Sequence, residues 1–259
     1  MIAVDKRAII GKCCAAARSY KDNLLGTTVL FVHRDGAAAG YFEATFGPEH
    51  FAHLTGLKPN HSPERGVTSR MLFELAAAGE LAEADVAWPR RLDLVEMKLE
   101  VLPAMTRIDT SARMTGEHDD SPIVDLRTDR LAGNVAACMG FVWADDSYVP
   151  NTVLKADIRN LTADSPQRIL AVWKKPAGSP ASAYAPSRLA KGMDEREKAL
   201  VEGVLASLRA SDAPSPRSYG KPDRPAPERA PSPVEDLRRA PSSRGPSRDA
   251  PPRQRRDPR

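Results

Sequence analysis

The sequence predicts an α+β fold, with N-terminal helices and a hairpin followed by a four-stranded antiparallel sheet and a disordered C-terminal tail. Three observations predict it. Apolar residues recur every three or four positions in most of residues 4–102, whereas short runs between residues 123 and 174 follow the alternation of strands. From residue 211 the chain is rich in proline, arginine and serine, and such a composition buries too little apolar surface to offset the entropy of ordering.

The N-terminal elements have clear local signals. A helix is expected over residues 4–25, with Asp5 as its N-cap and Gly26 as its end. Residues 27–33 are rich in β-branched side chains, and an Asp-Gly turn separates them from the run 41–46. Two such runs around an Asp-Gly turn predict a β-hairpin.

The remaining elements follow from the same two periodicities. Further helices are expected over residues 48–56, 62–79 and 92–102. The four strands of the sheet are expected over residues 123–127, 135–143, 153–158 and 168–174. The segments between them, 129–134, 145–150 and 163–167, are rich in turn-forming residues. Strands joined by short turns predict an antiparallel meander.

The chain is expected to divide into three parts. Residues 1–176 form the α+β domain, residues 177–210 form a linker with one isolated helix over 193–208, and residues 211–259 form the tail. The tail holds 11 arginines and one lysine against seven acidic residues, which leaves 26 basic and 27 acidic residues in the rest. A strongly cationic nucleic-acid-binding body is therefore excluded.

Several classes of protein are not expected. No apolar run approaches the roughly 18 residues of a membrane span, and the N-terminus lacks the features of a secretory signal. The three cysteines, Cys13, Cys14 and Cys138, offer neither a disulfide framework nor a Cys-x-x-Cys metal site. We expect small buried thiols in a reducing cytoplasm, with no membrane association and no cofactor.

The run from His53 to Lys58 carries the strongest chemical signal. It combines an imidazole, the hydroxyl of Thr55 and an ammonium around Gly56, which lets the backbone turn sharply. An imidazole with a pKa near 6.5 suits general acid or base catalysis. A simpler interpretation, which composition alone favours, leaves His53 near the carbonyl end of a helix whose apolar residues fill the core.

A zinc site is a minor alternative for the same region. His50 and His53 lie three residues apart and could share a helical face, with His61 as a third ligand. No pattern of carboxylates supports a metal there, so none is expected.

The predicted sheet carries further candidates. Thr152 and Lys155 are three residues apart, and on a regular strand they would point to opposite faces unless a bulge intervenes. Lys174 and Lys175 end the last strand, where one of them shares a face with its alternating neighbours. These positions also fit solvated lysines at the ends of strands.

Six segments, taken in order, carry a resemblance to a known family. They are residues 20–24, 29–32, 42–46, 51–56, 148–152 and the strand around residues 173–174. In this order they resemble the fourth group of phage-associated nucleases related to barnase, EndoU, colicin E/D and RelE. The resemblance covers residues 5–176, and its most specific part is the Phe-x-His-Leu-Thr-Gly run at residues 51–56.

The resemblance implies helices leading into a four-stranded antiparallel sheet. It also implies a metal-independent endoribonuclease of a phage or other mobile element, toxin-like in character, in which the RNA 2′-hydroxyl attacks the adjacent phosphorus. His53 would be the acid or base, and Thr55 and Thr152 would donate hydrogen bonds to the phosphate. RNA and a cognate inhibitor protein are the expected partners.

Charge and strand position add further residues to this expected site. Lys155 and Lys174 would stabilise negative charge in the transition state, and four more cationic side chains would bind substrate: Lys58, Arg70, Arg127 and Lys175. Two other hypotheses stay open. One is an inactive relative of the same fold that binds RNA or a protein, and the other is a structural phage protein whose tail docks onto nucleic acid.

Overall fold

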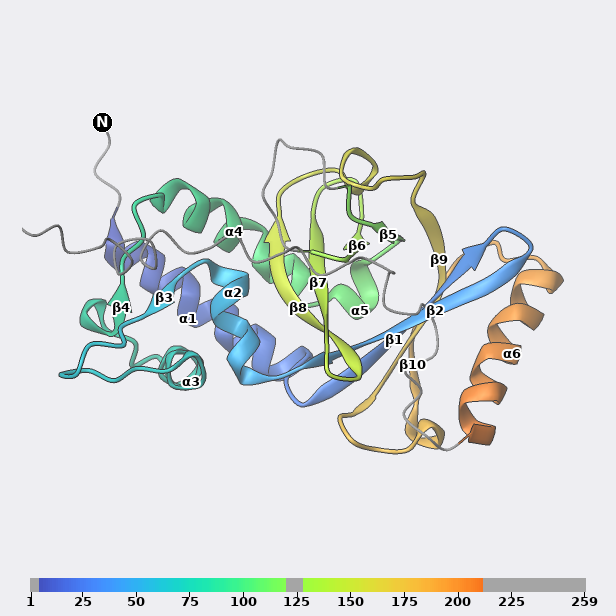
Figure 1. The fold of residues 1–259 in the computed structure, drawn as a ribbon, viewed down its shortest axis with the longest axis horizontal. Coiled ribbons are helices and arrows are strands. Elements are labelled where there is room, and N and C mark those ends of the chain that lie inside the picture. The colour runs from blue at the N-terminus through green and yellow to red at the C-terminus, as the bar shows by residue number, and fades with distance from the viewer. Residues whose placement is uncertain (1–4, 120–127, 212–259) are drawn as a thin grey trace, which may run out of the picture. The chain divides into compact units, whose positions relative to one another are not determined.

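The computed structural model describes residues 5–119 and 128–211 (Figure 1). The strand expected over residues 123–127 lies outside the described residues, and so does the tail expected to be disordered, apart from Ser211 at its start. Helix α1 spans Lys6–Asn23 and begins as expected, because the Asp5 side chain accepts hydrogen bonds from the backbone N–H groups of Arg7 and Ala8. The chain turns at Gly26, whose φ is +68°.

The predicted hairpin is confirmed. Strands β1 (Thr27–Asp35) and β2 (Ala38–Phe46) pair along their whole length, from Thr27 opposite Phe46 to Asp35 opposite Ala38. Strand β1 buries both of its faces. Phe31 packs into the core shared with the helices, whereas Leu30 packs into a second core on the other side.

The helices keep roughly their expected places. Thr68 caps α3 by accepting a hydrogen bond from the N–H of Met71 at 3.2 Å, which starts this helix later than expected. The bounds of the helices after β2 are Pro48–His50 (η1), Phe51–Thr55 (α2), Ser69–Ala78 (α3), Glu83–Asp85 (η2), Leu92–Met105 (α4), Ile108–Ser111 (α5), Ile158–Asn160 (η3), Ala181–Ala183 (η4) and Glu195–Ser211 (α6). None of these described helices is both long enough and apolar enough to cross a membrane.

The other strands extend the hairpin into a large sheet. They are β5 (Met114–Glu117), β6 (Arg130–Gly133), β7 (Cys138–Ala144), β8 (Ser147–Leu154), β9 (Gln167–Pro176) and β10 (Ala185–Leu189). The strand order is β1-β2-β8-β7-β6-β5-β9-β10, and β9 also pairs with β1. Seven strands therefore close on themselves, with β10 added to β9. The β2–β8 pair is parallel, and the other pairs of this sheet are antiparallel. Strands β3 (Lys58–Pro59) and β4 (Val86–Ala87) form a separate pair.

The expected four-stranded antiparallel sheet is therefore wrong, although the fold is α+β. The sheet is larger because the hairpin strands also pair with β8 and β9. It also gains short strands without an alternating pattern. Residues 129–134, expected to form a turn, contain the four-residue strand β6. Strands β5 and β10 are also short, with four and five residues, and contain glycine, arginine or proline.

The two larger of three hydrophobic clusters among the described residues hold most of these elements together. In the larger cluster, helices α1–α4 pack against the sheet around a group of aromatic rings. Tyr20 contacts Phe46, Phe51 and Phe73, and its hydroxyl donates to the carbonyl oxygen of Gly47 at 2.8 Å. All three cysteines are buried and free, as expected.

The helix expected to be isolated packs against the sheet instead. Helix α6 lies alongside β1, β2 and β9 (Figure 1), and Val201 and Leu208 join Leu30 and Leu170 in the second cluster. Burying an aliphatic side chain of this size contributes about 1.5–3 kcal/mol. Residues 185–211 are therefore part of the folded body.

Candidate functional site

Strand β9 changes its neighbour along its length. Near its start, Arg168 lies opposite Met114 of β5. Farther along, Ala171 lies opposite Leu189 of β10, and the register of β10 shifts between Pro186 and Arg188. The start of β5 and the end of β10 are thereby both held beside the first half of β9.

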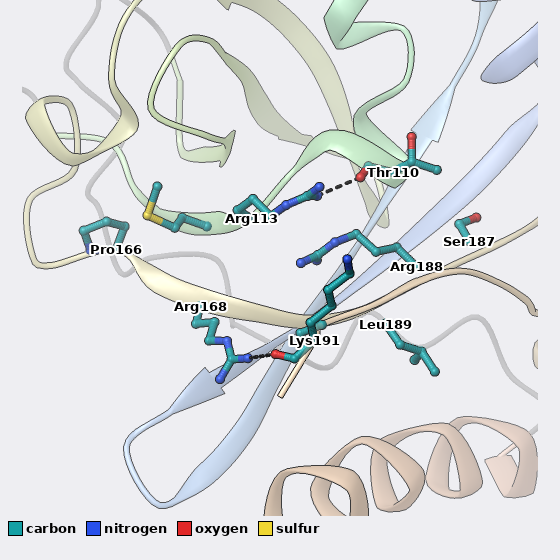
Figure 2. Close-up of a pocket in the computed structure, with 10 residues that line it drawn as sticks. Thr110, Arg113, Pro166, Arg168, Ser187, Arg188, Leu189 and Lys191 are labelled. Atoms are coloured by element: carbon teal, nitrogen blue, oxygen red, sulfur yellow. Dashed lines mark hydrogen bonds between the residues drawn. The ribbon is translucent and has the colours of Figure 1, made fainter. Parts of the chain in front are cut away.

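A pocket of about 650 Å³ opens at this change of neighbours (Figure 2). Its lining comes from α5, β5, β9, β10 and the residues next to them. The lining residues are Thr110, Arg113, Met114, Pro166, Arg168, Ser187, Arg188, Leu189, Ala190 and Lys191. Four of these side chains are cationic and none is acidic. We call it the cationic pocket.

The three arginines of the cationic pocket are held in place by hydrogen bonds to carbonyl oxygens. Arg113 donates from Nη1 to the carbonyl oxygen of Thr110 at 2.7 Å. Arg168 donates from Nη2 to the carbonyl oxygen of Lys191 at 2.7 Å, and Arg188 donates from Nη1 to that of Ile169 at 3.4 Å. Figure 2 shows Arg113, Arg188 and Lys191 directed toward the same part of the pocket.

The positive charges of the pocket lie close enough to act on one another. Burial, followed by the charges of Arg113 and Arg168, lowers the pKa of Arg188 to about 10. Arg188 therefore remains charged at neutral pH. Because guanidinium groups bind phosphate oxygens with paired N–H donors, this arrangement is suited to an anionic phosphate.

One acidic side chain supports the pocket from outside its lining. Glu197 of α6 is 5% exposed, and both of its carboxylate oxygens lie 3.3 Å from Nη1 of Arg168. The same carboxylate lies 3.6 Å from Nη1 of Arg34 on β1. Glu197 therefore fixes Arg168 in position and balances part of its charge.

The residues predicted near α2 lie away from this lining. His53 has an exposed side chain, and its carbonyl oxygen accepts a hydrogen bond from Nζ of Lys98 at 3.0 Å. The Thr55 hydroxyl is buried, donates to the carbonyl oxygen of Ala52 at 2.9 Å and accepts from the N–H of Leu57 at 3.1 Å. It therefore closes the end of α2.

The two cationic residues predicted to bind substrate beside α2 are exposed. Lys58 lies on β3, and Arg70 forms an ion pair with Glu49 at 3.3 Å. Arg127, predicted with them, lies outside the described residues.

Thr152 and His53 belong to different sides of the sheet. Val153 joins the core cluster of Leu54, which is next to His53 on α2. Thr152 points the other way, beside Gly140, and is 2% exposed. Its hydroxyl makes no hydrogen bond with the described residues.

The predicted lysines of the sheet also have separate contacts. Lys155 forms an ion pair with Glu100 at 2.5 Å, and Lys174 forms one with Asp109 at 2.9 Å. Lys175 donates to the carbonyl oxygen of Ser179 at 2.8 Å, and it lines a second pocket of about 460 Å³. The structure does not gather the eight described site predictions around one point, and none of them lines the cationic pocket.

The zinc set considered for the histidines does not form in the described part of the chain, where no three His, Cys, Asp or Glu side chains group as metal ligands. His50 instead accepts a hydrogen bond at Nδ1 from the N–H of Gly47 at 3.0 Å. Burial lowers the pKa of His50.

Sequence reasoning missed all four cations of the pocket, namely Arg113, Arg168, Arg188 and Lys191. They are scattered over nearly 80 positions, and two of them lie in residues 177–210, which were expected to be a linker. The available signal was weak. Residues 184–191 contain two basic side chains and no acidic one.

Comparison with known proteins identifies the family of the chain. A family model described as phage-Barnase-EndoU-ColicinE5/D-RelE like nuclease 4 matches residues 12–181. No curated protein and no solved structure is significantly similar to the chain. The matched residues include Arg113 and Arg168 of the cationic pocket, and they cover well over half of the sequence. The chain belongs to this family of phage-associated, barnase-, EndoU-, colicin- and RelE-like nucleases.

Proposed function

We propose that this nuclease is an endoribonuclease that holds the RNA backbone in the cationic pocket. The observation that carries the proposal is the gathering of Arg113, Arg168, Arg188 and Lys191 in one lining without an acidic side chain. Each nucleotide of RNA contributes one negative phosphate, and contacts from arginine and lysine supply most of the affinity for such a backbone.

The proposed reaction uses the RNA's own 2′-hydroxyl. The 2′-oxygen loses its proton and forms a bond to the adjacent phosphorus, while the bond from phosphorus to the 5′-oxygen breaks and that oxygen gains a proton. The products are a 2′,3′-cyclic phosphate and a 5′-hydroxyl. Arg113 and Arg188 would donate hydrogen bonds to the phosphoryl oxygens, where negative charge increases in the transition state. No metal ion takes part in the proposed step.

The groups that move protons form a separate part of the proposal. The resemblance implies His53 as acid or base, and this role stays a prediction. The lining of the pocket contains no histidine and no carboxylate. This observation favours a second candidate, in which the chain binds RNA in the pocket without cleaving it.

A cognate inhibitor is also proposed, as expected for nucleases of this kind. Such a protein would need acidic groups to fill the pocket, because Glu197 pairs with Arg168 alone among the four cations, and a neutral surface would supply no counter-charge to Arg113, Arg188 and Lys191.

The full chain is the material for the test, with labelled RNA in the presence of EDTA. We expect cleavage to persist, to yield a cyclic phosphate and to stop when the 2′-hydroxyl next to the cut is replaced by hydrogen. Arg188→Gln should lower kcat/KM by about 100-fold, the range found when one such donor is removed. Arg91→Gln is the matched control, because Arg91 is exposed and its guanidinium pairs with Asp93.

Each result decides between the two candidates. RNA that stays intact while Arg188→Gln weakens its binding would favour the binding module. Cleavage that disappears with EDTA and returns with a divalent cation would reject the metal-independent reaction. If Arg188→Gln and Arg91→Gln cleave RNA equally well, the active site lies outside the cationic pocket.

A further inference from the structure

We infer that the cationic pocket is a site for a terminal phosphomonoester of a polynucleotide, which it binds more tightly than an internal phosphodiester. The inference rests on the proposed function only for the polynucleotide nature of the ligand. The phosphate preference follows from how the charges of the pocket are arranged.

The cationic side chains surround one pocket and are not arranged in a line along the surface. Four cations from three segments of the chain line one pocket of about 650 Å³, and of these Arg168 has an acidic partner in Glu197. A phosphodiester carries one negative charge, whereas a phosphomonoester carries about 1.5 to 2 at neutral pH and offers three strong acceptor oxygens. Concentrated positive charge therefore favours the monoester, since a single negative charge compensates less of the repulsion among the cations.

The arginines still have donors for such a group. Within the described residues, the hydrogen bonds of Arg113 and Arg188 use only Nη1 of each side chain. Their Nε and Nη2 groups can donate to a ligand, together with Nζ of Lys191. Because the bonds at Nη1 already orient both guanidiniums, binding loses less side-chain entropy than at free arginines.

The rim of the pocket has an apolar part that fits the rest of a terminal nucleotide. Leu189 is 54% exposed, one of few large apolar side chains so exposed among the described residues. Met114 and Pro166 also belong to the lining. With the phosphate on the cations, the sugar and base of the last nucleotide would pack on these side chains.

The direct test measures binding of the full chain to short DNA strands of one sequence by fluorescence anisotropy. DNA has no 2′-hydroxyl and cannot undergo the proposed cleavage, so the result does not depend on catalysis. Three strands are compared, with a 5′-phosphate, with a 3′-phosphate and with hydroxyls at both ends. We expect at least one phosphorylated strand to bind about 10-fold more tightly than the hydroxyl strand.

Two variants test whether the preference for a phosphorylated strand arises in the cationic pocket. Arg188→Gln should remove most of this difference, whereas Arg91→Gln should retain it. The arginine-rich residues 211–259 are present in all variants, so their contribution to binding cancels. Competition with inorganic phosphate distinguishes a polynucleotide end from free phosphate as the ligand. If the pocket recognises a polynucleotide end, free phosphate should compete far more weakly than the phosphorylated strand.

Two outcomes would overturn the inference. One is equal affinity for all three strands, and the other is an equal loss of affinity for all three in Arg188→Gln. The second outcome would still support backbone binding in the pocket, and hence the proposed function. Conversely, if the protein prefers a phosphorylated strand but cleaves no RNA, the result would support the inference and reject the proposed endoribonuclease activity.

Discussion

Glu197 of α6 and Arg168 of β9 form an ion pair in which both carboxylate oxygens lie 3.3 Å from the same guanidinium nitrogen. The carboxylate is buried, whereas Arg168 reaches the cationic pocket. The pair therefore joins the helix that covers one face of the sheet to the proposed binding site.

Glu197→Ala is expected to destabilise the fold by about 2 kcal/mol. The figure lies below the 3–5 kcal/mol of a fully buried pair, because both arginines near Glu197 are partly exposed. Urea denaturation measures the loss. Glu195→Ala, in an exposed pair with Lys198 on the same helix, should change stability by less than about 0.5 kcal/mol. Equal effects of the two variants would contradict the structural role of Glu197.

Gly56→Ala and Gly11→Ala should have opposite effects. Gly56 ends α2 with φ of +74°, and a Cβ there would lie 3.2 Å from Cδ of Lys98. Alanine in that conformation costs about 1–2 kcal/mol. Gly11 lies inside α1 with nothing within 4 Å of the same atom, so alanine should stabilise the helix by about 0.5–1 kcal/mol. Thermal melts of both variants check the two signs.

Acidification from pH 7 to pH 5 should destabilise the protein through His33. This side chain is 0% exposed, and burial, with the charge of Arg130, lowers its pKa to about 4. The unfolded chain takes up a proton near pH 6.5 and the folded chain does not. The free energy of unfolding therefore decreases as the pH falls from about 6.5 to about 4, and it levels off below about pH 4. The expected loss from His33 is about 2 kcal/mol at pH 5.

Urea denaturation at pH 7 and pH 5 measures this loss, and an NMR titration of the His33 ring gives the pKa directly. His33→Gln should reduce the difference between the two pH values, whereas His53→Gln, at an exposed position, should leave it unchanged. A ring that titrates above pH 6 would refute the explanation even if His33→Gln does not fold.

His53→Ala separates the two locations considered for the chemistry. If cleavage takes place at the cationic pocket without His53, the variant should retain activity within about threefold, as should Lys155→Ala, which breaks an exposed ion pair with Glu100. An RNA cleavage assay at neutral pH checks both. If the activity of His53→Ala falls by about 100-fold and that of Lys155→Ala does not, the result would indicate that a group at the end of α2 transfers the proton.

The elements that the sequence predicted well are those whose signals are local. The Asp5 cap, the β-branched run of β1 and the Asp-Gly turn lie within a few residues of what they determine. The role of Thr55 is equally local, since its hydroxyl bonds within three residues. The simpler interpretation of that helix end placed its apolar residues in the core, and Leu54 and Leu57 are buried.

Closure of the sheet could not be predicted in this way. Strand β6 is four residues long and contains a buried arginine, and β10 contains proline and arginine, so neither alternates between apolar and polar residues. Both exist because their backbones pair with strands distant in sequence, which no local pattern reveals. The cationic pocket depends on the same pairing, since Arg113 and Arg188 meet only where β9 changes its neighbour.

The position of β10 has an evolutionary consequence. Ser187, Arg188, Leu189 and Lys191 of the pocket lie after residue 181, where the family match ends, whereas the closed ring of strands lies before it. If the cationic pocket binds an anion as proposed, substitutions in this stretch would alter which anion it binds and would leave the residues that close the ring unchanged. Under that proposal, the choice of ligand would be free to change while the scaffold stays the same.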